Sequence, residues 1–174
     1  MTFEPPRSPA PNSSERDLLL GYIHWQREQV VATAHGLTDE QIRWHPTRGL
    51  LPIGGIINHL TKMEWRWVEG RYLGEEFPPR TEEFDLAADV TLAQLVGAYW
   101  QQAQRTEAAV RGAESLDASC LGNEHGRGPA HELLGFEHPI TLRWVLLHLI
   151  EETAHHAGHA DATRELLDGK TMRA

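Results

Sequence analysis

Residues 141–161 read TLRWVLLHLIEETAHHAGHAD, and apolar residues recur in this stretch at three- and four-residue steps. This spacing is the period of an α-helix that buries one face and exposes the other. We expect the helix to begin near Pro139 or Thr141 and to run to about Leu167, because Gly169 follows. A long helix with one apolar face is typical of a helical bundle.

Three earlier segments have the same period. They are expected to form helices from Glu15 to about His35, from Pro52 to about Leu73, and from Thr91 to about Gly112. A short helical turn through Trp44 is expected between the first two. No segment alternates apolar and polar residues as a half-buried strand does, so the sequence predicts an all-α fold, a four-helix bundle.

The connections between these helices differ in length and composition. Residues 75–90, which include Pro78 and Pro79, predict a long crossover connection, and residues 113–137 predict a loop that could form a lid. Residues 1–13 contain four prolines and are expected to be a flexible leader. We therefore expect residues 14–174 to form a single bundle domain.

The composition excludes several classes of protein. The chain has 174 residues and a formal net charge of −9, and its cations are scattered, so no nucleic-acid partner is expected. The sequence has no apolar run of about 18 residues and no signal-peptide pattern, which indicates a cytoplasmic protein without a membrane partner. Its one cysteine, Cys120, cannot form an internal disulfide.

Histidine and glutamate residues are concentrated in the last helix. Three pairs that are four residues apart could chelate a metal ion: Glu151 with His155, Glu152 with His156, and His155 with His159. Helical geometry distinguishes these pairs, because each residue turns the helix by about 100°. With His148 at zero, the apolar face is centred at about 90°.

Glu152 and His156 are the pair expected to face the core. They fall at about 40° and 80°, inside the apolar arc, whereas Glu151 and His155 point toward solvent. His159, at about 20°, lies at the edge and could either complete a site or support it. The angles therefore favour Glu152 and His156 as the chelating pair.

A buried carboxylate beside a buried imidazole is costly unless it is paired or bound to a cation. His59 borders the apolar stripe of the second helix and could supply a third ligand from a facing helix. The sequence thus predicts a site formed by His59, Glu152 and His156 for one divalent metal ion: zinc, nickel, iron or manganese. The alternative is that Glu152 and His156 form only a structural hydrogen bond.

Four segments carry a resemblance to a known family: Gly36–Gln41, Asn58–Leu60, Thr141–Trp144 and Glu151–Asp161. Together they resemble the DinB-like superfamily of metal-binding four-helix bundles, which includes bacillithiol and mycothiol S-transferases, and within it an actinobacterial subgroup of unknown function. In many members, zinc or nickel is held by one His on the second helix and two residues four apart on the last. The resemblance implies the same three ligands here and a homodimer.

The resemblance also implies a function. It points to a metal-dependent thiol S-transferase that adds a low-molecular-weight thiol, mycothiol or a similar one, to an electrophile during detoxification or stress. Two alternatives stay open: a non-enzymatic metal-binding stress protein, and a metal-dependent hydrolase with Glu151, His148 or His159 as proton shuttle. Cys120 lies in a loop without local cations and is a weak candidate for a nucleophile.

Overall fold

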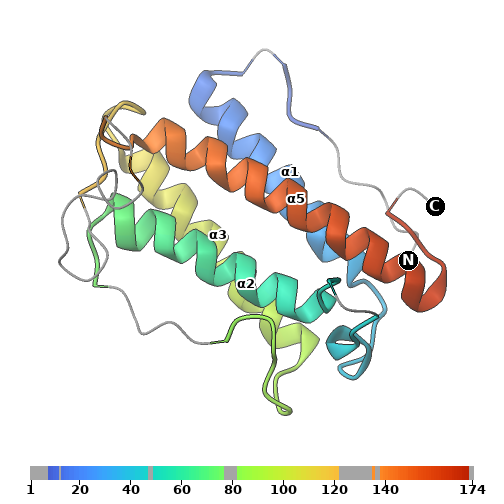
Figure 1. Ribbon diagram of the computed structural model, residues 1–174. Helices are drawn as coiled ribbons and strands as arrows, with labels where there is room; N and C mark the ends of the chain where they lie inside the picture. The colour runs from blue at the N-terminus through green and yellow to red at the C-terminus, as the bar shows by residue number, and fades with distance from the viewer. Residues whose placement is uncertain are drawn as a thin grey trace.

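A computed structural model describes residues 8–11, 13–46, 49–76, 82–121, 135 and 138–172. Within these ranges, four long helices form a bundle (Figure 1): α1 (Glu15–Thr33), α2 (Ile53–Trp65), α3 (Leu92–Gly112) and α5 (Leu142–Asp168). A short 3-10 helix, η1 (Gln41–Arg43), precedes α2, and a π-helix, η2 (Arg66–Tyr72), continues it. The prediction of an all-α four-helix bundle is confirmed.

The cap residues explain why the helices begin where they do. The side chain of Ser14 accepts a hydrogen bond from the backbone N–H of Asp17, and Thr91 forms a reciprocal capping box with Gln94. The side chain of Thr141 accepts a hydrogen bond from the backbone N–H of Trp144 at the start of α5. At its far end, α5 stops at Gly169, whose φ of 76° is in the left-handed region that favours glycine.

The prediction for the second helix was wrong in one respect. A single helix was expected from Pro52 to about Leu73, but the turns widen at Arg66 and form η2. The N–H of Leu73 accordingly donates to the carbonyl of Val68, five residues earlier, at 2.9 Å. Such widened turns depend on tertiary packing, and the apolar period of the sequence does not reveal them.

Hydrogen bonds between helix ends define the topology. Arg143 donates to Glu15 at 2.7 Å and joins the starts of α5 and α1, so these two helices are parallel. The Thr163 hydroxyl donates to the carbonyl of Leu51 at 3.0 Å, which joins the end of α5 to the start of α2. The helix α2 is therefore antiparallel to α5, and α3 is antiparallel to α1, because Arg16 donates to the carbonyl at the end of α3.

Because α2 and α3 are parallel, the chain between them must return along the length of α2. Residues 82–86 of this crossover lie directly on α2, where the amide of Asn58 donates to the carbonyl of Glu83 at 2.6 Å. A Cβ atom at Gly55 would overlap the backbone of Phe84, so only glycine permits this approach. The predicted crossover is thus present, although Pro78 and Pro79 lie outside the described residues.

The core is built mainly from aliphatic side chains of all four helices, including Ile23, Ile56, Leu60, Leu95, Leu146 and Leu149. One ion pair is buried among them: the guanidinium of Arg27 donates to Glu64 at 2.5 and 3.1 Å. Among the described residues, no helix is both long and apolar enough to span a membrane. Most of the loop predicted at 113–137 lies outside the described residues.

Candidate metal centre

The three side chains predicted as metal ligands lie together where α2 faces α5. His59 comes from α2, Glu152 and His156 come from α5, and one ligand atom of each lies within 4.8 Å of the others. Two ligands of one ion with bonds of about 2 Å lie no more than about 4 Å apart. Small side-chain rotations would therefore bring the three ligand atoms onto one ion.

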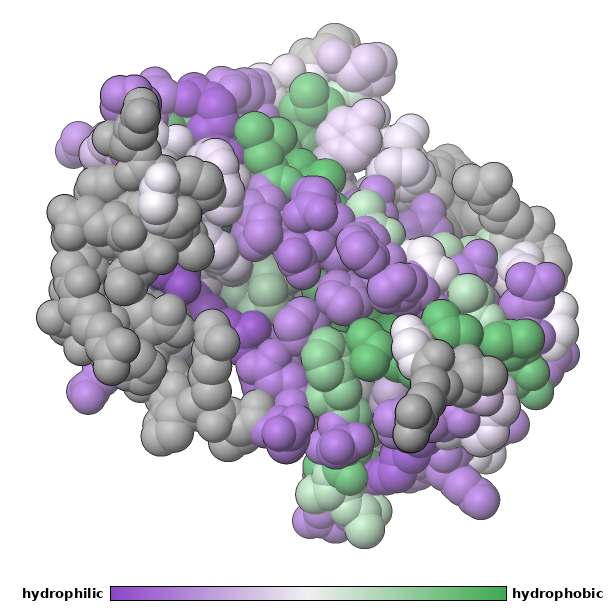
Figure 2. Space-filling model, in the orientation of Figure 1, coloured by the Kyte–Doolittle hydropathy of each residue, from purple (hydrophilic) through white to green (hydrophobic). Residues whose placement is uncertain are grey.

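Glu152 and His156 lie at the edge of the buried face of α5, where their side chains are only partly exposed. The buried residues of the helix include Thr153 and Ala157. The centre of the buried face is therefore rotated slightly about the helix axis relative to the centre that the sequence predicted. His156 is consequently at the flank of that face, with 12% of its side chain exposed, and Glu152 is 31% exposed. His155 is exposed, as predicted. Figure 2 shows a band of hydrophilic residues along α5.

His156 has the properties of a neutral ligand. Burial, together with the charges of His59, His159 and His155, lowers the pKa of His156 to about 4. The side chain is then neutral at pH 7, which is the form of imidazole that binds metals. Its buried Nδ1 atom has no hydrogen-bond partner among the described residues, an arrangement that is costly in the absence of a ligand.

The distance between Glu152 and His156 shows whether this pair forms a direct hydrogen bond. Oε2 of Glu152 lies 3.8 Å from Nε2 of His156, which is too long for a hydrogen bond. The alternative of a structural hydrogen bond is therefore not supported. Two imidazoles and one carboxylate are a donor set that suits zinc, nickel, iron or manganese, so the residues present fit a divalent ion.

A carboxylate on the crossover connection contacts the ring of His59. Oε2 of Glu83 lies 2.7 Å from Nδ1 of His59, and Arg66 donates to both carboxylate oxygens of Glu83. Burial by itself raises the pKa of Glu83, but the hydrogen bonds and positive charge of Arg66, with a smaller contribution from His59, hold it below its usual value. Glu83 is thus an anionic acceptor.

Sequence analysis did not identify Glu83, Arg66 or Phe84 as part of the site. Phe84 stacks on the ring of His59 with 4.7 Å between centroids. Glu83 and Phe84 lie in a connection without periodicity, 24 and more residues after His59. Only the path of the crossover over α2 brings them to the site, and no local pattern in the sequence encodes that path.

A second group of ligand-type residues shares Glu152 with the first. His148, Glu151 and Glu152 also place one ligand atom each within 4.8 Å of the others. Burial lowers the pKa of His148, which stacks on Trp144 with 5.0 Å between centroids. Trp67 meets the same ring edge-on at 4.7 Å. Aromatic rings therefore border the metal centre next to a neutral imidazole.

His159 stands slightly apart from these groups. Its ring centroid is 5.8 Å from that of His156, and it belongs to neither group of converging ligand atoms. Like His156, it has a buried Nδ1 atom without a partner in the described part of the chain. The position fits a supporting residue better than a ligand.

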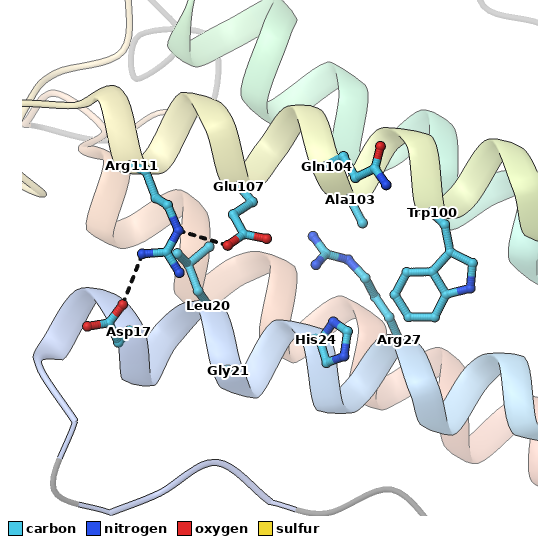
Figure 3. Close-up of a pocket in the computed structure, with 10 residues that line it drawn as sticks. All are labelled: Asp17, Leu20, Gly21, His24, Arg27, Trp100, Ala103, Gln104, Glu107 and Arg111. Atoms are coloured by element: carbon cyan, nitrogen blue, oxygen red, sulfur yellow. Dashed lines mark hydrogen bonds and ion pairs between the residues drawn. The ribbon is translucent and has the colours of Figure 1, made fainter.

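A groove of about 420 Å³ between α1 and α3 is separate from this centre (Figure 3). None of the three predicted ligands lines it. Within the groove, Arg111 binds Asp17 at 3.1 Å and Glu107 at 2.8 Å. Arg27 pairs with Glu64, which does not line the groove. The groove thus offers paired charges, whereas the centre between α2 and α5 offers unpaired nitrogen atoms.

Comparisons with known proteins agree with this fold. The crystal structure of a conserved protein from Enterococcus faecalis is similar, with a TM-score of 0.64 and 14% sequence identity. The similarity covers 91% of this chain and 99% of that chain, and at this identity it concerns the fold alone. A search of curated proteins found no significant match.

A family profile gives the more specific result. The profile described as mycothiol-S-transferase matches residues 18–169, a range that contains His59, Glu152 and His156. The match extends over all four helices of the bundle, apart from the first three residues of α1. The chain therefore belongs to the mycothiol-S-transferase family.

Proposed function

We propose that this protein is a divalent-metal-dependent S-transferase that joins a low-molecular-weight thiol, mycothiol or a similar one, to an electrophile. His59, Glu152 and His156 would hold one ion, with zinc or nickel as the first candidates. The observation that carries the proposal is the convergence of these three side chains within 4.8 Å in a member of this family. A role in detoxification or stress follows from the removal of electrophiles.

In this proposal, each residue of the site has a separate role. A bound divalent ion lowers the pKa of a thiol and so supplies the nucleophilic thiolate at neutral pH. His59 and His156 would contribute imidazole nitrogen donors, and Glu152 would contribute negative charge that offsets part of the cation's charge. Phe84, next to His59, limits the access of water and offers an apolar surface to the electrophile.

The protein's own cysteine does not supply this thiol. Burial raises the pKa of the Cys120 thiol to about 11, so it is almost entirely protonated at neutral pH. A nucleophilic sulfur must therefore come from a separate molecule. In the transfer, a sulfur–carbon bond forms, the thiol proton is released, and the leaving group departs with its bonding electrons.

Metal analysis followed by a thiol assay tests the proposal. Protein purified without an affinity tag is analysed for its metals, and product formation from mycothiol and a bimane electrophile is then followed. We expect about one divalent ion per chain, and a thiol-dependent rate that chelation abolishes and reloading restores. A His156→Ala variant should lack both the ion and the rate.

Other outcomes identify the alternatives. Bound metal without turnover of any thiol would indicate a metal-binding stress protein, and hydrolysis that needs no thiol would indicate a hydrolase. Either result would overturn the proposed transferase activity. Absence of metal from protein incubated with zinc and with nickel would overturn the metal centre itself.

A further inference from the structure

We infer that Glu83 is the positioning residue of the metal centre. In this arrangement its carboxylate fixes the ring of His59 so that Nε2 is left to bind the ion, and Arg66 fixes the carboxylate. The inference rests on the proposed metal centre but not on transferase activity. It assigns a role to the crossover connection between α2 and α3, which the fold requires for topological reasons only.

The contact between Glu83 and His59 determines which ring nitrogen is available. Nδ1 of His59 lies 2.7 Å from Oε2 of Glu83, a short distance that is typical of a bond to a charged acceptor. A carboxylate only accepts, so Nδ1 carries the hydrogen. In the neutral ring, Nε2 then keeps its lone pair for a cation. Exposed fractions of 16% and 14% mean that water competes little with this bond.

Arg66 prevents the carboxylate from turning away. It donates to Oε1 through one terminal nitrogen and to Oε2 through the other, the second at 3.2 Å. A guanidinium that binds both oxygens holds the plane of the carboxylate, which a single hydrogen bond does not. Arg66 is the first residue of η2, so the change of helix type begins at the residue that anchors Glu83.

The backbone of the crossover is held as firmly as its side chain. The amide of Asn58, the residue before His59, donates to the carbonyl of Glu83 at 2.6 Å. Gly55, one turn earlier, allows the backbone of Phe84 to lie against α2. The ring of Phe84 covers one face of His59, with an interplanar angle of 22°. His59 is therefore fixed at Nδ1 and on one face of its ring.

His156 lacks a support of this kind. Its Nδ1 atom has no hydrogen-bond partner among the described residues. The two imidazoles of the centre are thus unequal: His59 is oriented before the ion arrives, and His156 adjusts to it. Partners that orient a ligand in this way change metal affinity by about 10- to 100-fold.

The first test measures zinc affinity in the full-length, metal-free protein by competition with a chelator. Glu83→Gln keeps the shape of the side chain but removes its charge, and it should weaken binding by about 10- to 100-fold. Glu82→Gln is the matched control, because Glu82 is exposed and next in sequence. This variant makes the same change in charge and should keep the zinc affinity within about twofold of the wild-type value. Equal affinities for the Glu83→Gln variant and the wild type would overturn the inference.

The second test needs no metal. Long-range ¹H–¹⁵N correlation NMR of the metal-free wild type should show His59 with its hydrogen on Nδ1, and Glu83→Gln should give a mixture of the two tautomers. A wild-type His59 with its hydrogen on Nε2 would overturn the inference, even if the variant does not fold. If the wild-type protein does not bind zinc, the proposed metal centre is wrong. The NMR result would still decide whether Glu83 fixes the ring of His59.

Discussion

The imidazole rings of His59 and His156 lie with 4.8 Å between their centroids, although one belongs to α2 and the other to α5. Burial beside other histidines lowers the pKa of His156. Two imidazoles that face each other in this way cannot both be protonated without repulsion. A shared cation removes that difficulty and uses the lone pairs of both rings.

The first prediction concerns His159. It lies outside both groups of converging ligand atoms, which favours a supporting role over ligation. We expect His159→Ala to weaken metal binding by about 10- to 100-fold without abolishing it. Isothermal titration of metal-free protein with zinc or nickel would measure the change. A loss as complete as that of His156→Ala would instead identify His159 as a ligand.

The second prediction concerns the buried ion pair between Arg27 and Glu64, whose side chains are 4% and 3% exposed. Arg27→Met leaves the carboxylate buried without a partner and should lower the free energy of unfolding by about 3–5 kcal/mol. The double variant with Glu64→Leu removes both charges and should recover most of this loss. Urea unfolding of the three proteins checks both statements, and equal losses in the single and double variants would contradict them.

The helices could be predicted from the sequence because their signals are local. Ser14, Thr91 and Thr141 are cap residues, and the predicted boundaries of α1, α3 and α5 lie within about three residues of the observed ones. The orientation of His156 was also predictable, since rotation about the helix axis separates it from its exposed neighbour His155.

The rest of the site could not be predicted, because it depends on tertiary structure. Glu83 reaches His59 only because α2 and α3 are parallel and the chain must return over Gly55. The widened turns of η2, which begin at Arg66, have no periodic signature in the sequence. The sequence around Glu83 is typical of a polar loop, and polar loops are common whether or not they support a functional site.

The third prediction is a pH dependence that follows from the raised pKa of Cys120, about 11 in the folded protein against an ordinary value of 9.0. At pH 8 about one thiol in a thousand is ionised in the folded chain, so alkylation by iodoacetamide should be about 100-fold slower than in urea. Between pH 9 and 11 the unfolded chain loses this proton first, so stability should fall as the pH rises. Mass spectrometry and urea unfolding measure the two effects. A Cys120→Ser variant is the control, because without this thiol the fall in stability between pH 9 and 11 should be smaller.

The fourth prediction is that the protein forms a homodimer. Both α1 and α5 expose large apolar side chains, among them Tyr22 and Leu147. Association would remove such surface from water, and closed dimers are the commonest symmetric assembly. Sedimentation velocity at micromolar concentration should therefore give a dimer. A single monomeric species under those conditions would contradict the prediction.

The fifth prediction tests the metal centre itself by comparing His155 and His156, which are adjacent and chemically identical. Only His156 faces His59, so His156→Ala and His59→Ala should lose most of the bound metal, and His155→Ala should keep it. Glu152→Gln should also bind weakly, because it removes the anionic oxygen. Metal content per chain, measured by elemental analysis of these four variants after dialysis against the same zinc solution, is the most direct test. The account predicts a near-empty His156→Ala and a filled His155→Ala, and the reverse result would contradict it.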